Sequence, residues 1–143
     1  MLKRTDWILL LLREKPLDRI RLMKALFLIW LRSGRNIPGF FEFVPYMYGP
    51  CSFDLYDEID RAGQDRLLTQ VPGPNPRWSP YYITERGKKA ADQASQDADA
   101  ATLRLVRAVA QEVSELNFHN LLQRVYAEAP DFATNTVVRA LRQ

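Results

Sequence analysis

The chain has 143 residues, 47% of them hydrophobic and 26% charged, a balance that is typical of a globular domain and excludes a disordered or fibrous chain. Its single cysteine excludes an internal disulfide, and its single histidine excludes a metal site built from a histidine cluster. The formal net charge of +3 is unevenly distributed, because residues 1–35 carry nine Lys or Arg against three Asp or Glu, whereas residues 36–70 carry two against six.

The N-terminus begins like a signal peptide, with Lys3 and Arg4 ahead of the apolar run Trp7–Leu12. This run ends at Arg13 after six apolar residues, and no small-residue cleavage site follows it. A second apolar run, residues 22–31, is too short to span a bilayer. We therefore expect a cytoplasmic protein with no membrane partner.

Two helices are predicted in the first quarter of the chain. Thr5 or Asp6 can cap the first helix, which Pro16 breaks. Asp18 caps the second helix, which runs to about Ser33. Apolar residues cover almost the whole circumference of the second helix, and this predicts that it is the buried central helix of the fold.

A third helix and a β-hairpin are predicted in the middle of the chain. Residues 40–50 are rich in aromatic residues, but two prolines confine this extended segment to an edge or a loop. Ser52 caps the third helix, which ends near Ala62. Strands at residues 67–71 and 81–84 flank a proline-rich loop, and this arrangement predicts the hairpin.

Three more helices are predicted in the remainder of the chain. Thr84 caps the first of them, and residues 92–101 either continue it or form a short connector. Apolar residues then repeat at helical spacing in residues 103–116 and again in residues 121–126. The last helix ends before Pro130, because proline cannot continue it.

The order of these elements predicts the fold class. We expect a mostly α protein in which residues 1–91 form a winged helix-turn-helix, with the small β-hairpin as its wing. Residues 92–143 are expected to form a C-terminal helical extension. Because no linker or internal repeat separates the two parts, one domain is predicted for residues 1–143.

Four blocks of sequence spread over most of the chain form a further pattern: Arg21–Leu28, Phe41–Tyr56, Tyr82–Gly87 and Val125–Ala133. Together they resemble the YwgA-like small bacterial proteins and, more distantly, the SocA/Panacea antitoxin group. Phe41–Tyr56 is the most specific block. The resemblance implies a helical, winged-helix-like domain without an assigned reaction. In the Panacea group it also implies an antitoxin or adaptor that binds other proteins, and it supplies no catalytic residues.

An acidic stripe is predicted on the outward face of the third helix. It consists of Asp54, Asp57, Glu58 and Arg61, spaced i, i+3, i+4 and i+7. In a helix-turn-helix this helix enters the major groove, where carboxylates oppose contact with phosphates. We therefore expect the stripe to face solvent and to bind a protein partner with a basic surface. The alternative is a solvated face without a partner.

Other candidate binding residues lie outside this stripe. Tyr46 and Tyr48 can contribute to recognition of the partner, since tyrosine combines apolar area with a hydrogen-bonding tip, although packing is the alternative. The remaining candidates are basic residues and a wing tryptophan that can contact nucleic acid, or else form a solvated rim: Arg19, Arg21, Arg77, Trp78, Lys88 and Lys89.

The sequence contains no pattern that indicates catalysis. Cys51 precedes a helix but has no His, Lys or Arg beside it in the sequence, and this predicts a buried or inert thiol. His119 has no partner for triad chemistry, and no glycine-rich phosphate loop is present. Lys24, alone among apolar neighbours, is expected to extend its ammonium group to the surface. We expect no enzyme activity, no cofactor and no metal.

The function that these observations favour is a non-enzymatic interaction or regulatory module that binds a macromolecular partner. A toxin or a subunit of a phage-defence complex is the partner that the resemblance implies. The alternative is a DNA-binding winged-helix transcriptional regulator. A homodimer is compatible with both interpretations.

Overall fold

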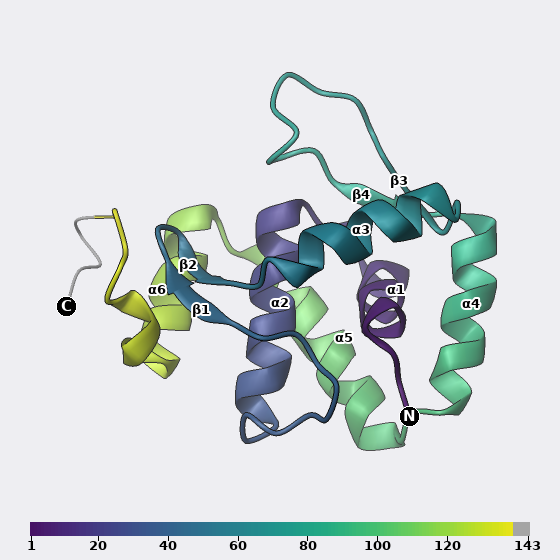
Figure 1. Ribbon diagram of the computed structural model, residues 1–143, viewed down its shortest axis with the longest axis horizontal. Coiled ribbons are helices and arrows are strands. Elements are labelled where there is room, and N and C mark those ends of the chain that lie inside the picture. The colour runs from purple at the N-terminus through teal and green to yellow at the C-terminus, as the bar shows by residue number, and fades with distance from the viewer. Residues whose placement is uncertain (139–143) are drawn as a thin grey trace.

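The computed structural model describes residues 1–138, so residues 139–143, at the end of the predicted extension, lie outside the described residues. Within residues 1–138 the chain forms six α-helices and two separate antiparallel hairpins (Figure 1). The helices are α1 (Arg4–Glu14), α2 (Arg19–Arg32), α3 (Asp54–Gln64), α4 (Glu85–Gln96), α5 (Ala100–Glu115) and α6 (Phe118–Glu128), followed by the 3-10 helix η1 (Pro130–Ala133). The strands are β1 (Val44–Tyr46), β2 (Gly49–Cys51), β3 (Leu68–Gln70) and β4 (Tyr81–Ile83). The fold is therefore mostly helical, as predicted.

The two N-terminal helices form the centre of the hydrophobic core. Six successive residues of α1, Trp7–Leu12, and eight successive residues of α2, Leu22–Ile29, are buried. Helices α4 and α5 pack against α1, and α5 also packs against α2 (Figure 1). The prediction that α2 is a buried central helix is confirmed. No described helix combines the length and the apolar character that a membrane span requires.

Local capping signals explain where several helices begin. The carboxylate of Asp18 accepts a hydrogen bond from the backbone N–H of Arg21 at 2.9 Å, which confirms it as the N-cap of α2. The hydroxyl of Thr84 accepts from the N–H of Gly87 at 3.0 Å and caps α4 in the same way. The start of α1 differs from the prediction, because its N-cap is Lys3.

The start of α3 was also predicted incorrectly. Its N-cap is Phe53, not Ser52, and no side chain provides the capping hydrogen bond. The backbone N–H of Ser52 instead donates to the sulfur of Met23 at 3.2 Å, in the core. The segment before α3 is therefore held by packing on α2. This contact joins residues that are distant in the sequence, so the residues next to the helix do not reveal it.

The hairpin predicted at residues 67–84 is present as β3–β4. Leu68 lies opposite Ile83, and Gln70 lies opposite Tyr81. The side-chain amide of Gln70 donates to the carbonyl oxygens of Pro76 and Ser79 at 2.8 and 3.0 Å, so it ties the loop at residues 71–80 to the strands. We call this segment the wing loop, and it extends away from the helices at the top of Figure 1.

The extended segment at residues 40–50 contains a second hairpin that was not predicted. Strands β1 and β2 pair with Pro45 opposite Pro50, and the chain turns at residues 47–48. The turn requires glycine at position 49, where φ is +93° and an added Cβ would lie 3.0 Å from Leu122 and 3.2 Å from Lys24. The hairpin thereby sits against α2 and α6.

The C-terminal helices follow the predicted order. Helix α4 continues to Gln96, and Asp99 caps α5 by accepting from the N–H of Thr102 at 2.7 Å, so the polar stretch at 92–101 is divided between a helix and a short connector. Helix α6 ends at Glu128, ahead of Pro130, as expected. Helices α4 and α5 pack against α1, and α5 and α6 pack against α2 (Figure 1).

Candidate functional site

The predicted acidic stripe does not lie on a single exposed face. Glu58 is only 8% exposed, and its carboxylate accepts a hydrogen bond from the Thr5 hydroxyl at 2.9 Å and pairs with Arg61 at 3.1 Å. Asp54 is half-exposed and lies 3.6 Å from the guanidinium group of Arg4. Asp57 and Arg61 do face solvent. The expectation that Glu58 faces solvent is therefore wrong, because α3 packs against the polar start of α1.

The predicted nucleic-acid residues occupy several different environments. Arg21 has a structural role. Its guanidinium donates to the carbonyl oxygens of Val113 and Leu116 at 3.1 and 2.8 Å and pairs with Asp18 at 2.5 Å. It joins α2 to the end of α5, so it does not form a free cation as the nucleic-acid interpretation requires.

The lysines and the tryptophan of that set are exposed but separated. Lys88 and Lys89 lie on α4, and Lys88 pairs with Glu85 at 3.4 Å. Trp78, on the wing loop, is 41% exposed and packs edge-on against Phe118 of α6, with ring centroids 5.4 Å apart. These positions do not combine into one basic surface.

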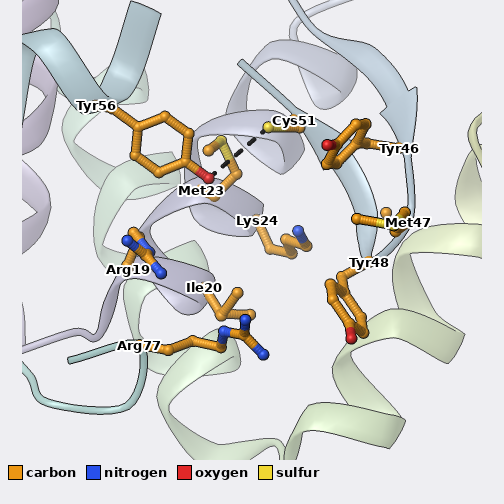
Figure 2. A pocket seen from close by; sticks show the side chains of 11 residues that line it. Arg19, Ile20, Met23, Lys24, Tyr46, Met47, Tyr48, Cys51, Tyr56 and Arg77 are labelled. Atoms are coloured by element: carbon orange, nitrogen blue, oxygen red, sulfur yellow. Dashed lines mark hydrogen bonds between the residues drawn. The ribbon is translucent and has the colours of Figure 1, made fainter. Parts of the chain in front are cut away.

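The structure instead brings residues from both predicted sets into one pocket of about 140 Å³. Its walls come from α2, the β1–β2 hairpin, α3 and the wing loop. Figure 2 shows Arg19 and Tyr56 on one side, Tyr46, Met47 and Tyr48 on the other, and Lys24 between them. We call it the cation pocket. The full lining is Arg19, Ile20, Met23, Lys24, Tyr46, Met47, Tyr48, Gly49, Cys51, Tyr56 and Arg77.

Two arginines of the cation pocket are positioned by tyrosine rings. The guanidinium carbon of Arg19 lies 5.4 Å from the ring centroid of Tyr56, and that of Arg77 lies 5.4 Å from the ring centroid of Tyr48. A guanidinium over an aromatic face is held by cation–π attraction. Arg19, at the start of α2, and Arg77, in the wing loop, are thus fixed at the same pocket although they are far apart in sequence.

The third cation, Lys24, is buried inside the pocket wall. Its side chain is 3% exposed, and its ammonium donates to the carbonyl oxygen of Pro50 at 3.2 Å. The expectation that Lys24 reaches the surface is wrong, because the β1–β2 hairpin covers it. Burial lowers the pKa of Lys24 to about 8, an effect that nearby Cys51 and Asp18 partly oppose. The ammonium is therefore still largely protonated at neutral pH.

Cys51 and Tyr56 also line the pocket. The Cys51 thiol is buried, as predicted, and its sulfur lies 3.9 Å from the Tyr56 hydroxyl (Figure 2). Burial and the adjacent thiol raise the pKa of Tyr56. Lys24 and Cys51 were not predicted as site residues, whereas Tyr56 was considered, with Tyr46 and Tyr48, as a possible member of a recognition surface. For Lys24 the available signal was a lysine among the apolar residues of α2. Its spacing of i and i+5 from Arg19 separates the two side chains by about 140° around the helix, so the helical pattern did not assign them to one face.

A cluster of exposed apolar side chains adjoins the pocket. Val44, Tyr46, Met47 and Phe53 are between 40% and 56% exposed, although all four are large hydrophobic residues. The rings of Tyr46 and Phe53 meet edge-on with centroids 5.5 Å apart. We call these four residues the hairpin patch. Tyr46 and Met47 belong to both the hairpin patch and the cation pocket.

No family model matches the chain, and no curated protein matches it. Within residues 1–138, no group of three or more His, Cys, Asp or Glu side chains is arranged to hold a metal ion. The site presents three cations and three tyrosines to a small cavity, beside an exposed apolar patch.

Proposed function

We propose that this protein is a non-enzymatic, cytoplasmic interaction module that binds a protein partner through the hairpin patch. The observation that carries the proposal is the exposure of four large apolar side chains within residues 44–53. Contiguous apolar side chains on a soluble protein mark interaction surfaces. A toxin or a phage-defence-complex subunit is the kind of partner suggested by the resemblance to the YwgA-like and Panacea proteins.

The composition and rigidity of the hairpin patch support this proposal. Tyrosine, phenylalanine and methionine are enriched in protein interfaces. Tyr46 is fixed by the pairing of β1 with β2 and by its edge-on contact with Phe53, at an interplanar angle of 82°. Side chains that are already ordered before binding lose less conformational entropy when the complex forms. The patch is therefore suited to act as an anchor.

We further propose that α1–α3 and the β3–β4 hairpin form a winged helix-turn-helix that serves as a scaffold for protein binding. The order of three helices followed by a hairpin supports this assignment. The face of α3 available to DNA carries Asp54, Asp57 and Asp60, which repel phosphates. We expect weak duplex binding that is strongly salt-dependent, and this makes the DNA-binding regulator the less favoured alternative.

The test is a binding measurement with purified proteins encoded beside the gene for this chain. The variants Val44→Asp and Phe53→Asp alter the hairpin patch at two residues that do not themselves line the cation pocket. We expect each to weaken the complex by at least about tenfold, or about 1.4 kcal/mol. Val71→Asp is the matched control, because Val71 is 48% exposed but lies in the wing loop.

Two results would contradict the proposal. A tight complex that tolerates both patch variants would locate the interface elsewhere on the protein. Absence of any protein complex, together with binding to one defined duplex that survives about 200 mM salt, would favour the DNA-binding regulator.

A further inference from the structure

The cation pocket concentrates positive charge without a balancing acid in its lining. Arg19, Lys24 and Arg77 contribute three cations, and none of the described residues that line the pocket is Asp or Glu. The carboxylate of Asp18 is close enough to affect Lys24, but it is already engaged by the guanidinium and backbone N–H of Arg21. Like charges gathered in this way repel one another unless an anion lies among them.

Hydrogen-bond donors in the pocket are also left without acceptors. The Nε atom of Arg19 is buried and has no hydrogen-bond partner among residues 1–138. The ammonium of Lys24 has three protons, and within those residues one carbonyl oxygen, that of Pro50, accepts from it. Buried donors normally have partners, because an unsatisfied one carries a desolvation penalty. A ligand with several acceptor oxygens would supply them.

We propose that the cation pocket binds the phosphoryl group of a phosphate monoester. At neutral pH such a group carries a charge of about −1.5 to −2 and three acceptor oxygens. A carboxylate carries one charge and two oxygens, so it matches three cations less well. Arginine guanidinium groups also have the planar donor geometry that suits phosphate oxygens.

The size and walls of the pocket restrict the rest of the ligand. A cavity of about 140 Å³ is close to the roughly 150 Å³ that holds one benzene molecule, so it accommodates the phosphoryl group with a short organic segment. Tyr46, Met47 and Tyr48 form an aromatic and apolar wall opposite Arg19 (Figure 2). An apolar or aromatic segment next to the phosphate therefore fits this wall, and the remainder of the ligand extends outside.

The proposal is tested separately from binding of a protein partner, because the probes are small anions. Phenyl phosphate is titrated into the full-length protein by calorimetry, and phenylacetate serves as the carboxylate of similar size. We expect half-saturation by phenyl phosphate at or below about 1 mM and binding of phenylacetate at least about tenfold weaker. The proposal would be overturned if the two anions bound equally well. It would also be overturned if neither anion bound at concentrations several-fold above about 1 mM.

Variants locate the binding site. Arg77→Gln changes an exposed loop and leaves the helices untouched, whereas Arg19→Gln and Lys24→Met change the α2 side of the pocket. We expect each to weaken phenyl phosphate binding at least about tenfold. Arg104→Gln, on the exposed face of α5, removes the same charge outside the pocket and should have no effect. Unchanged binding by Arg77→Gln and Arg19→Gln would overturn the assignment.

A last comparison distinguishes the source of the phosphoryl group. Phenyl phosphate is compared with a short peptide that contains phosphotyrosine, which offers the same ring and phosphate on a peptide backbone. Tighter binding of the peptide would favour a modified protein side chain as the ligand, whereas equal or weaker binding would favour a small phosphorylated compound. Each of these results is compatible with a phosphoryl site. The proposal requires that Arg77→Gln weakens binding of phenyl phosphate and of the peptide alike.

Discussion

The guanidinium carbon of Arg77 in the wing loop lies 5.4 Å from the ring centroid of Tyr48 at the turn of the β1–β2 hairpin. This contact connects the two hairpins across the cation pocket. Residues 48 and 77 are therefore coupled through space, and the geometry of the pocket depends on whether the wing loop stays against the hairpin.

The first prediction concerns this contact. Tyr48→Leu removes the aromatic face and should lower the free energy of unfolding by about 0.5–1 kcal/mol, whereas Tyr48→Phe keeps the ring and should have a smaller effect. A double-mutant cycle with Arg77→Ala, measured by urea denaturation, isolates the pairwise energy. Strictly additive effects of Tyr48→Leu and Arg77→Ala would show that the contact contributes nothing to stability.

The second prediction compares two neighbouring carboxylates on α3. Glu58→Ala removes a buried acceptor and leaves the Thr5 hydroxyl without its partner, so we expect a loss of about 1–3 kcal/mol in the free energy of unfolding. Asp57→Ala, one residue away but exposed, should change it by no more than about 0.5 kcal/mol. Chemical denaturation of both variants measures the difference, and similar effects of the two would contradict the buried position of Glu58.

The third prediction concerns the pH dependence that Lys24 confers on stability. Its pKa is about 8 in the folded protein and 10.5 when the side chain is in water. Below pH 8 the amine is protonated in both states, and the folded state bears the cost of burying the charge. Above pH 8 the folded state releases the proton first, so the unfolded state binds more protons and the free energy of unfolding rises with pH. Between about pH 7 and 9 this contribution amounts to roughly 1 kcal/mol.

Comparison with Lys24→Met isolates this contribution. The other titratable and charged groups around the amine, Asp18, Cys51, Tyr56 and the two pocket arginines, are present in both proteins, so their effects largely cancel. We expect the stability of the wild-type protein relative to Lys24→Met to increase between pH 7 and 9. An unchanged difference at the two pH values would mean that the folded protein does not bury the charged amine.

Local signals in the sequence were sufficient for much of the helical framework. The caps at Asp18 and Thr84 and the proline-rich loop at 72–80 each specify a boundary through interactions within a few residues, and the structure has these boundaries where they were predicted. The β1–β2 hairpin was missed because Pro45 and Pro50 argue against paired strands. The two prolines lie opposite each other at a non-hydrogen-bonded pair of the antiparallel ladder, where neither residue has to donate a backbone N–H.

The candidate site could not be predicted, because it depends on contacts between distant segments. The helical pattern assigns Glu58 and Lys24 to a face of a helix, but it does not identify what covers that face. Thr5 covers the first, and the β1–β2 hairpin covers the second. Arg19 and Arg77 appeared as separate basic positions, and only the folded chain brings them to one cavity.

The burial of α1 and α2 has a consequence for synthesis of the protein. These two helices are made before α4 and α5, which cover them and lie later in the chain. Until residue 115 has left the ribosome, the apolar runs Trp7–Leu12 and Leu22–Ile29 lack their full cover. Nascent chains with such surfaces are prone to aggregate and bind chaperones. A fragment that ends after β4 would keep this exposure permanently, so removal of the C-terminal helices should leave an insoluble product.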